Sequence, residues 1–142
     1  MTTGHEDEPL HRLSSWIGTE DSNWTHYSSE LVAKTVLVDF RDRQWDQLQS
    51  EILNQPEYWQ HRCAVALGQD RTERAIAIMK LLLVHSQHRN VRMEAVYELD
   101  WAEVPMESDF GPLIRALIAS IPVDEIEPEF YSLLAKADAA KH

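Results

Sequence analysis

The sequence predicts an all-α fold in which antiparallel helical hairpins stack into a short array. Three observations predict it: a segment that nearly repeats itself 32 residues later, apolar residues spaced three and four apart along much of the chain, and turn residues between these stretches. A period of this length with a helical unit is typical of stacked-helix proteins, in which each unit buries its apolar face against its neighbours.

The repeat relates residues 58–68 to residues 90–100. Large and small apolar residues recur in it at the same offsets, and the matched pairs are Trp59 with Val91, Cys63 with Ala95, Ala64 with Val96, and Leu67 with Leu99. Offsets of four, five and eight residues lie on one face of a helix. We therefore expect both segments to be helices with the same buried face, and Cys63 to be a small core residue.

The N-terminal 27 residues are polar and are expected to form an arm, with a short helix near Leu10 to Ile17, followed by a helical domain over residues 28–142. A helical pattern runs from Ser29, a candidate N-cap, to Phe40, although its β-branched residues leave a strand as an alternative. A second helix is predicted over residues 42–53, and Pro56 suits the first turn of the next one.

The remaining chain predicts further helices separated by short links. The third spans residues 57–68 and ends at Gly68, a residue type that favours the position after a helix. Asp70 or Thr72 caps a helix over 72–86, and Asn90 caps one over 91–101. A helix opens at Ser108 or Asp109 and is stopped by Pro122, and a last one starts at Pro128. Links of this length suit antiparallel neighbours, which gives three hairpins after the helix over 29–40.

Composition places the chain among single-domain globular proteins. It has 142 residues, 44% of them hydrophobic, and one cysteine, which fits a reducing compartment. No apolar run approaches the roughly 20 residues that cross a bilayer, and no secretory signal is visible at the N-terminus. We therefore expect a cytoplasmic protein that does not bind membranes.

The net charge of −11 is unevenly distributed. Residues 1–59 carry eleven acidic and four basic residues, residues 60–93 carry two and six, and residues 94–129 carry ten acidic residues against Arg115 alone. Such a field repels nucleic acid and favours a basic protein partner, although charged runs are also common on faces that are merely solvated.

Motifs of catalysis are absent from the sequence: it contains no glycine-rich nucleotide loop, no H-E-x-x-H, no G-x-S-x-G and no C-x-x-C. His85 and His88 lack a third nearby ligand, so they suit the C-terminal end of the helix over 72–86 better than a zinc site. We expect a protein that is not an enzyme and that holds no metal or cofactor.

Two segments resemble second helices of short HEAT-like repeats. These are Trp59 to Gly68 (WQHRCAVALG) and Asn90 to Leu99 (NVRMEAVYEL), and the family pattern is approximately V-R-x-x-A-x-x-A-L-G. Gln60 departs from the pattern, since it replaces the usual arginine. The resemblance covers about residues 42–101 and extends over 109–140 only as a helix-turn-helix pattern. It implies an α-solenoid that binds proteins along a curved surface.

A candidate contact face lies opposite the repeated apolar stripe. Glu94, Glu98 and Trp101 are spaced to share one helix face, and an aromatic ring among carboxylates suits Arg and Lys side chains of a partner. Acidic residues of the following loops extend this predicted partner-binding surface, namely Glu103, Glu107, Asp109, Asp124 and Glu125. The alternative is that Trp101 packs under the next helix and the acids only solvate the surface.

These observations favour a non-enzymatic protein-binding module. Its most specific form is a bacterial immunity protein, an acidic inhibitor that neutralises a basic, nuclease-type toxin by covering its active site. The alternative, implied by the resemblance to lyase-type HEAT-like proteins, is an enzyme or enzyme accessory that acts on a protein-bound cofactor.

Overall fold

The computed structural model describes residues 8–140, and within that range the protein consists of α-helices and short 3-10 helices without a strand. The all-α class predicted from the sequence is confirmed. The α-helices are α2 (Glu8–Ile17), α3 (His26–Thr35), α4 (Asp42–Glu51), α5 (Glu57–Asp70), α6 (Glu73–His85), α7 (Arg89–Trp101), α8 (Phe110–Ala119) and α9 (Pro128–Ala139). The 3-10 helices are η1 (Leu37–Asp39), η2 (Ile52–Asn54) and η3 (Val123–Glu125).

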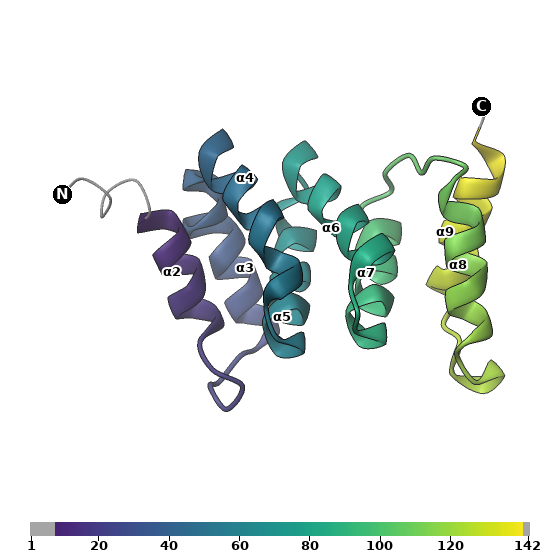
Figure 1. Ribbon diagram of the computed structural model, residues 1–142, viewed down its shortest axis with the longest axis horizontal. Helices are drawn as coiled ribbons and strands as arrows, with labels where there is room; N and C mark the ends of the chain where they lie inside the picture. The colour runs from purple at the N-terminus through teal and green to yellow at the C-terminus, as the bar shows by residue number, and fades with distance from the viewer. Residues whose placement is uncertain (1–7, 141–142) are drawn as a thin grey trace.

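Alternate helices pack side by side along the molecule. Helix α3 packs on α5, α5 packs on α7, and α7 packs on α9, so these four helices form a row. Helix α6 packs against both α5 and α7, and α8 packs against α9. Figure 1 shows the helices following one another from the N-terminal to the C-terminal end of an elongated molecule. Within residues 8–140 no helix is both long and apolar enough to cross a membrane.

The repeated stripe lies in the core, as its spacing predicts. The matched residues of α5 and α7 are all buried, and Cys63, Ala64, Leu67, Val91, Ala95, Val96 and Leu99 have no exposed surface. They belong to one hydrophobic cluster that also includes residues of α2, α3, α6, α8 and α9. The repeat therefore reports a shared burial pattern, which is the main stabilising contribution to helix packing in water.

The start of α3 differs from the expected one. Thr25, rather than Ser29, caps the helix: its hydroxyl accepts from the Ser28 amide, and the Ser28 hydroxyl accepts from the Thr25 amide. Ser29 is buried inside the helix, where its hydroxyl donates to the carbonyl of His26. After Thr35 the chain tightens into η1, so the β-branched residues there end the α-helix without forming a strand.

Two other expected helix ends are wrong. Helix α5 continues through Gly68 to Asp70, and Arg71 takes the left-handed conformation at its end, with φ of 59°. Asn90 lies inside the first turn of α7, after the N-cap position at His88, and its side chain donates to Glu57 instead. Helices α4, α6 and α9 match their predicted positions to within two or three residues.

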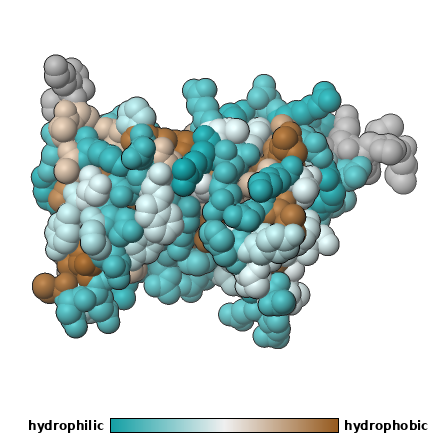
Figure 2. Space-filling model, turned by 180° about the vertical axis from the view of Figure 1, so that it is seen from behind, coloured by the Kyte–Doolittle hydropathy of each residue, from teal (hydrophilic) through white to brown (hydrophobic). Residues whose placement is uncertain are grey.

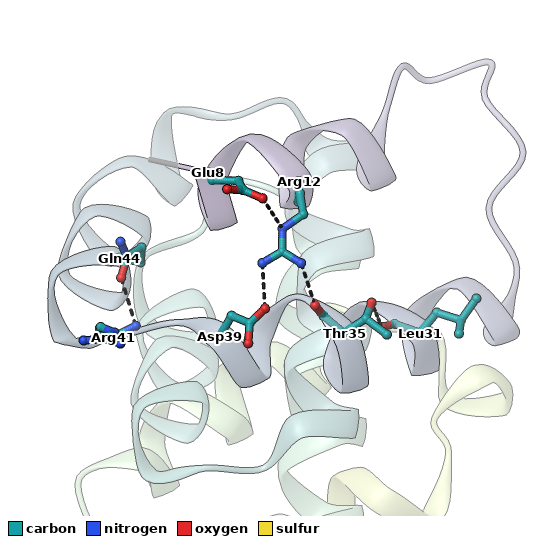
Figure 3. Close-up of polar contacts among 7 residues, drawn as sticks. All are labelled: Glu8, Arg12, Leu31, Thr35, Asp39, Arg41 and Gln44. Carbon is teal, nitrogen blue, oxygen red and sulfur yellow. Dashed lines mark hydrogen bonds and ion pairs between the residues drawn. The ribbon is translucent and has the colours of Figure 1, made fainter. Parts of the chain in front are cut away.

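Helix α2 is part of the packed domain. Leu13 and Ile17 are buried in the core. Arg12 donates to the carbonyl of Thr35 at 2.9 Å and to Asp39 Oδ2 at 2.7 Å (Figure 3), which ties α2 to the end of α3 and to η1. The short helix expected near Leu10 to Ile17 is thus present as α2, while residues 1–7 lie outside the described range.

Candidate functional site

Glu98 is buried between α7 and α5, although the sequence pattern places it on an outward face. Only 3% of its surface is exposed. The physical reason is Gly68 on α5, because a β-carbon at that position would overlap the Glu98 carboxyl group. A glycine inside a helix thus leaves the room that a buried acid on the neighbouring helix needs. Charge reversal at Glu98 would therefore disrupt the core and would not test a contact surface.

Glu94 and Glu98 form a hydrogen-bonded pair of carboxyl groups. Burial, followed by the hydrogen bond and the charge of Glu94, raises the pKa of Glu98 from 4.5 to about 9, against a smaller opposing effect of Arg71. Glu98 is therefore protonated at neutral pH and can donate its proton in the hydrogen bond to Glu94. Two carboxyl groups in contact with one shared proton avoid the repulsion of two buried charges.

Glu94 is held in its ionised form from two sides. Burial opposes its ionisation, but hydrogen bonds from His61 and Glu98, together with the charge of His61, lower its pKa below the usual value. The Nε2 atom of His61 lies 3.2 Å from Glu94 Oε1. The chain thus maintains one carboxylate, largely shielded from solvent, on the wall of a pocket.

This pocket has a volume of about 470 Å³ and lies between the loop over residues 18–24, α5 and α7. Its lining combines aromatic and other apolar side chains with carboxylates: Glu20, Trp24, Glu57, Tyr58, His61, Arg62, Asn90, Met93, Glu94 and Tyr97. Sequence reasoning missed it, apart from Glu94. The available signal was Trp24 and Tyr58, two large aromatic residues outside the repeated stripe.

Arg62 holds the loop wall of the pocket in place. Its guanidinium group donates to four backbone carbonyls, those of Ile17, Thr19, Glu20 and Ser22. It also lies 5.3 Å from the ring centroid of Tyr58 and 5.9 Å from that of Trp24. A positive charge therefore already lies near these two rings. Its hydrogen bonds go to backbone carbonyls, and no carboxylate within residues 8–140 forms an ion pair with it.

Trp101 is half-exposed, so it does not pack under the following helix. Its side chain is 48% exposed, its ring stacks on Tyr97 with centroids 5.8 Å apart, and its Nε1 donates to Glu129 Oε2 at 3.0 Å. Burial and the charges of Glu127, Glu129 and Glu94 raise the pKa of Tyr97. We call the surface formed by Trp101, Tyr97 and Glu129 the Trp101 face. It therefore combines an accessible aromatic ring with a negative electrostatic field.

The other predicted surface acids do not form one continuous face. All five are exposed, but they are separated by α8: Glu103, Glu107 and Asp109 precede it, whereas Asp124 and Glu125 lie in η3 after it. Ten helical residues span about 15 Å. Glu107 is also paired with Lys80 at 2.9 Å. Their role in partner binding stays a prediction.

The described residues contain no group of three or more His, Cys, Asp or Glu side chains placed to hold a metal ion. Cys63 is fully buried, and burial raises the pKa of its thiol. A thiol in that state is a poor nucleophile. The ionisable cluster formed by His61, Glu94 and Glu57 on α5 and α7 lines the pocket described above.

Figure 2 shows the molecule from the side opposite to that of Figure 1. The face seen in Figure 2 is largely covered by hydrophilic residues, and hydrophobic residues appear on it in separate spots. Exposed large apolar side chains within residues 8–140 are likewise scattered over several helices, among them Trp16, Val38, Trp101 and Val123. Comparison of the chain with models of protein families, with curated proteins and with solved structures finds no match.

Proposed function

We propose that this chain is a non-enzymatic protein-binding module, built as a short HEAT-like α-solenoid, whose partner is a basic protein of the nuclease-toxin type. The solenoid arrangement is supported by the contacts of α3 with α5, α5 with α7, and α7 with α9, because stacked hairpins place every second helix in one row. Fold alone does not define a function, so the proposal depends on the surface chemistry.

The observation that carries the proposal is the environment of Trp101. A half-exposed ring, stacked on Tyr97 and hydrogen-bonded to Glu129, stands in the field of several carboxylates. Aromatic rings attract guanidinium and ammonium groups, and Trp is one of the residue types enriched at the energetic centre of interfaces. An overall charge of −11 speeds association with a basic partner.

The test uses the tagged chain as bait in lysate of its source cells, at low and at high salt, with Trp101→Ala and Glu103→Lys as variants. The control variants are Trp16→Ala, which removes another partly exposed indole on α2, and Glu51→Lys, which makes the same charge change on α4. We expect one basic protein to be retained at low salt, released at high salt and lost with the Trp101 variant.

The captured protein is then purified, and its nuclease activity is measured with and without an equimolar amount of the chain. Loss of activity on addition of the wild-type chain, and much less loss with Trp101→Ala, supports the inhibitor role. Equal capture by all variants would show that the Trp101 face is not the contact surface, and capture of an acidic partner would overturn the proposal of a basic one. A basic partner without nuclease activity would remove the toxin part of the proposal.

A second candidate, an enzyme or enzyme accessory acting on a protein-bound cofactor, is favoured by one observation. The protonated Glu98 and the ionised Glu94 place a proton donor and a carboxylate side by side next to a pocket. Co-purification of a coloured small molecule or of a cofactor-carrying protein, lost on Glu94→Gln, would favour this candidate over the first.

A further inference from the structure

We propose that the pocket between α5, α7 and the loop over residues 18–24 is a binding site for a cationic side chain, namely an arginine or lysine of a partner protein. The inference deepens the proposed function and rests on it for the source of the cation. Tyr97 belongs both to the pocket lining and to the surroundings of Trp101, but the cation site has its own test.

The shape and lining of the pocket suit such a side chain. A volume of about 470 Å³ accommodates a long side chain together with part of its backbone. Tyr97 and Met93 supply an apolar wall for the methylene groups of an arginine or lysine, and these residue types commonly pack against such stems. Three carboxylates, those of Glu20, Glu57 and Glu94, line the same space.

The charge balance favours a cation over an anion. Among the described lining residues, His61 is paired with Glu94 Oε1 at 3.2 Å, and the remaining basic residue is Arg62, whose guanidinium group already donates to the carbonyls of the loop. It is therefore not placed to receive an anionic ligand. Glu94 is shielded from solvent, with 15% of its side chain exposed, so its charge is less screened than that of a surface acid.

The chain itself shows that these rings accept a guanidinium group. Arg62 lies near the rings of Trp24 and Tyr58 at distances typical of cation–π contacts. An incoming cation would occupy the other side of the pocket, between Glu57 on α5 and Glu94 and Tyr97 on α7. Asn90 donates to Glu57 Oε2 and so orients that carboxylate.

The test titrates the full chain, labelled with ¹⁵N, with Nα-acetyl-arginine amide and follows backbone and indole shifts by NMR. Two matched probes serve as controls: Nα-acetyl-citrulline amide, which has nearly the same shape without the charge, and acetate, which has the opposite charge. We expect weak, saturable binding of the arginine probe, with shifts at Tyr58, Met93 and Tyr97, and at least about ten-fold weaker binding of the citrulline probe.

Variants assign the site. Glu57→Gln is expected to weaken binding of the arginine probe about three-fold, as for other exposed ion pairs, and Glu57→Lys to abolish saturable binding. Glu51→Lys, the same change on an exposed acid outside the pocket, is expected to leave binding unchanged. Glu57 is exposed and lies in the first turn of α5, so these variants remain folded, which thermal unfolding checks.

The results distinguish this inference from the proposed function. Equal binding of the arginine and citrulline probes, preferential binding of acetate, or shifts that map outside the pocket would overturn the cation site, whatever the bait experiment shows. Conversely, probe binding in the pocket together with capture of no basic protein would leave the cation site standing and would overturn the proposed function.

Discussion

The carboxyl group of Glu98 on α7 occupies the space that a β-carbon on Gly68 of α5 would need. The two residues therefore set how closely the two repeated helices approach each other. Helix α5 shows no break at Gly68, so this glycine serves close packing and not a turn. Gly68 contributes to this contact by having no side chain, and Glu98 contributes a buried carboxyl group whose raised pKa keeps it neutral.

Gly68→Ala is expected to destabilise the protein by about 1–3 kcal/mol, because the new methyl group displaces a buried, hydrogen-bonded carboxyl group. Urea unfolding followed by circular dichroism measures the change. Gly111→Ala is the matched control, since Gly111 is also a buried helical glycine, but a β-carbon there meets the end of an exposed side chain, Asp138 Oδ1, at 3.1 Å. The added alanine also has a higher helix propensity than glycine. Equal effects of the two substitutions would contradict the proposed close contact.

A double-mutant cycle separates the steric effect from a general effect on α5. In a Glu98→Ala background the methyl group of Gly68→Ala has free space, so its cost is expected to fall by about 1 kcal/mol or more. Additive effects of the two substitutions would mean that Gly68 acts through its own helix and not through Glu98.

Arg62→Lys is expected to destabilise the protein by about 2 kcal/mol, because a lysine cannot reproduce the several donors that satisfy the loop carbonyls. Arg74→Lys is the control, since Arg74 makes exposed ion pairs with Asp42 and Asp46. Limited proteolysis offers a second readout: cleavage within residues 18–24 should accelerate in the Arg62 variant alone. Unchanged cleavage would show that the loop is held by other contacts.

Cys63 is expected to be unreactive towards a thiol reagent such as Ellman's reagent in the folded protein and fully reactive in denaturant. Its complete burial excludes the reagent, and the raised pKa of the thiol removes the reactive thiolate. The rate of labelling in dilute urea should therefore follow the population of unfolded molecules. Rapid labelling of the native protein would show that α5 opens locally, with Arg62→Lys as a variant expected to increase such opening.

The sequence predicted helix types and the buried stripe because both depend on local spacing. The repeat placed Cys63 and Ala95 correctly in the core, since small residues at matched positions report close helix packing. The orientation of Glu98 could not be predicted in the same way. Its burial depends on a glycine 30 residues earlier in the chain, and a charged residue type normally signals an exposed face.

The pocket was missed for a related physical reason. It is formed by a loop and two helices that are distant in sequence, and Arg62 joins α5 to the loop through contacts spanning 40 to 45 residues. Periodicity describes which side of a helix faces the core, but it contains no information on which loop covers the other side. The spacing of the sequence gives no indication that Trp24 and Tyr58 lie together.

The pKa of Glu98 makes the stability of the protein depend on pH. Above its ordinary value of 4.5 the unfolded chain loses this proton, whereas the folded protein keeps it up to about pH 9. The folded state therefore binds more protons over this interval, and its stability falls as the pH rises. The lowered pKa of Glu94 acts in the opposite direction, but its effect lies below the usual pKa, where stability falls as the pH is decreased.

Glu98→Gln is expected to remove most of this pH dependence, because a glutamine amide can donate to Glu94 as the protonated acid does but cannot ionise. Urea unfolding between about pH 5 and pH 9 should show a falling free energy of unfolding for the wild-type chain and a flatter profile for the variant. At about pH 8 the variant should be more stable by at least about 1 kcal/mol, which corresponds to less than one unit of pKa difference. Glu103→Gln, a change at an exposed acid, should keep the wild-type slope. A variant at Glu98 with the same slope as wild type would mean that Glu98 is already ionised in the folded protein at neutral pH, so that Arg71, and not Glu94, would be its dominant partner.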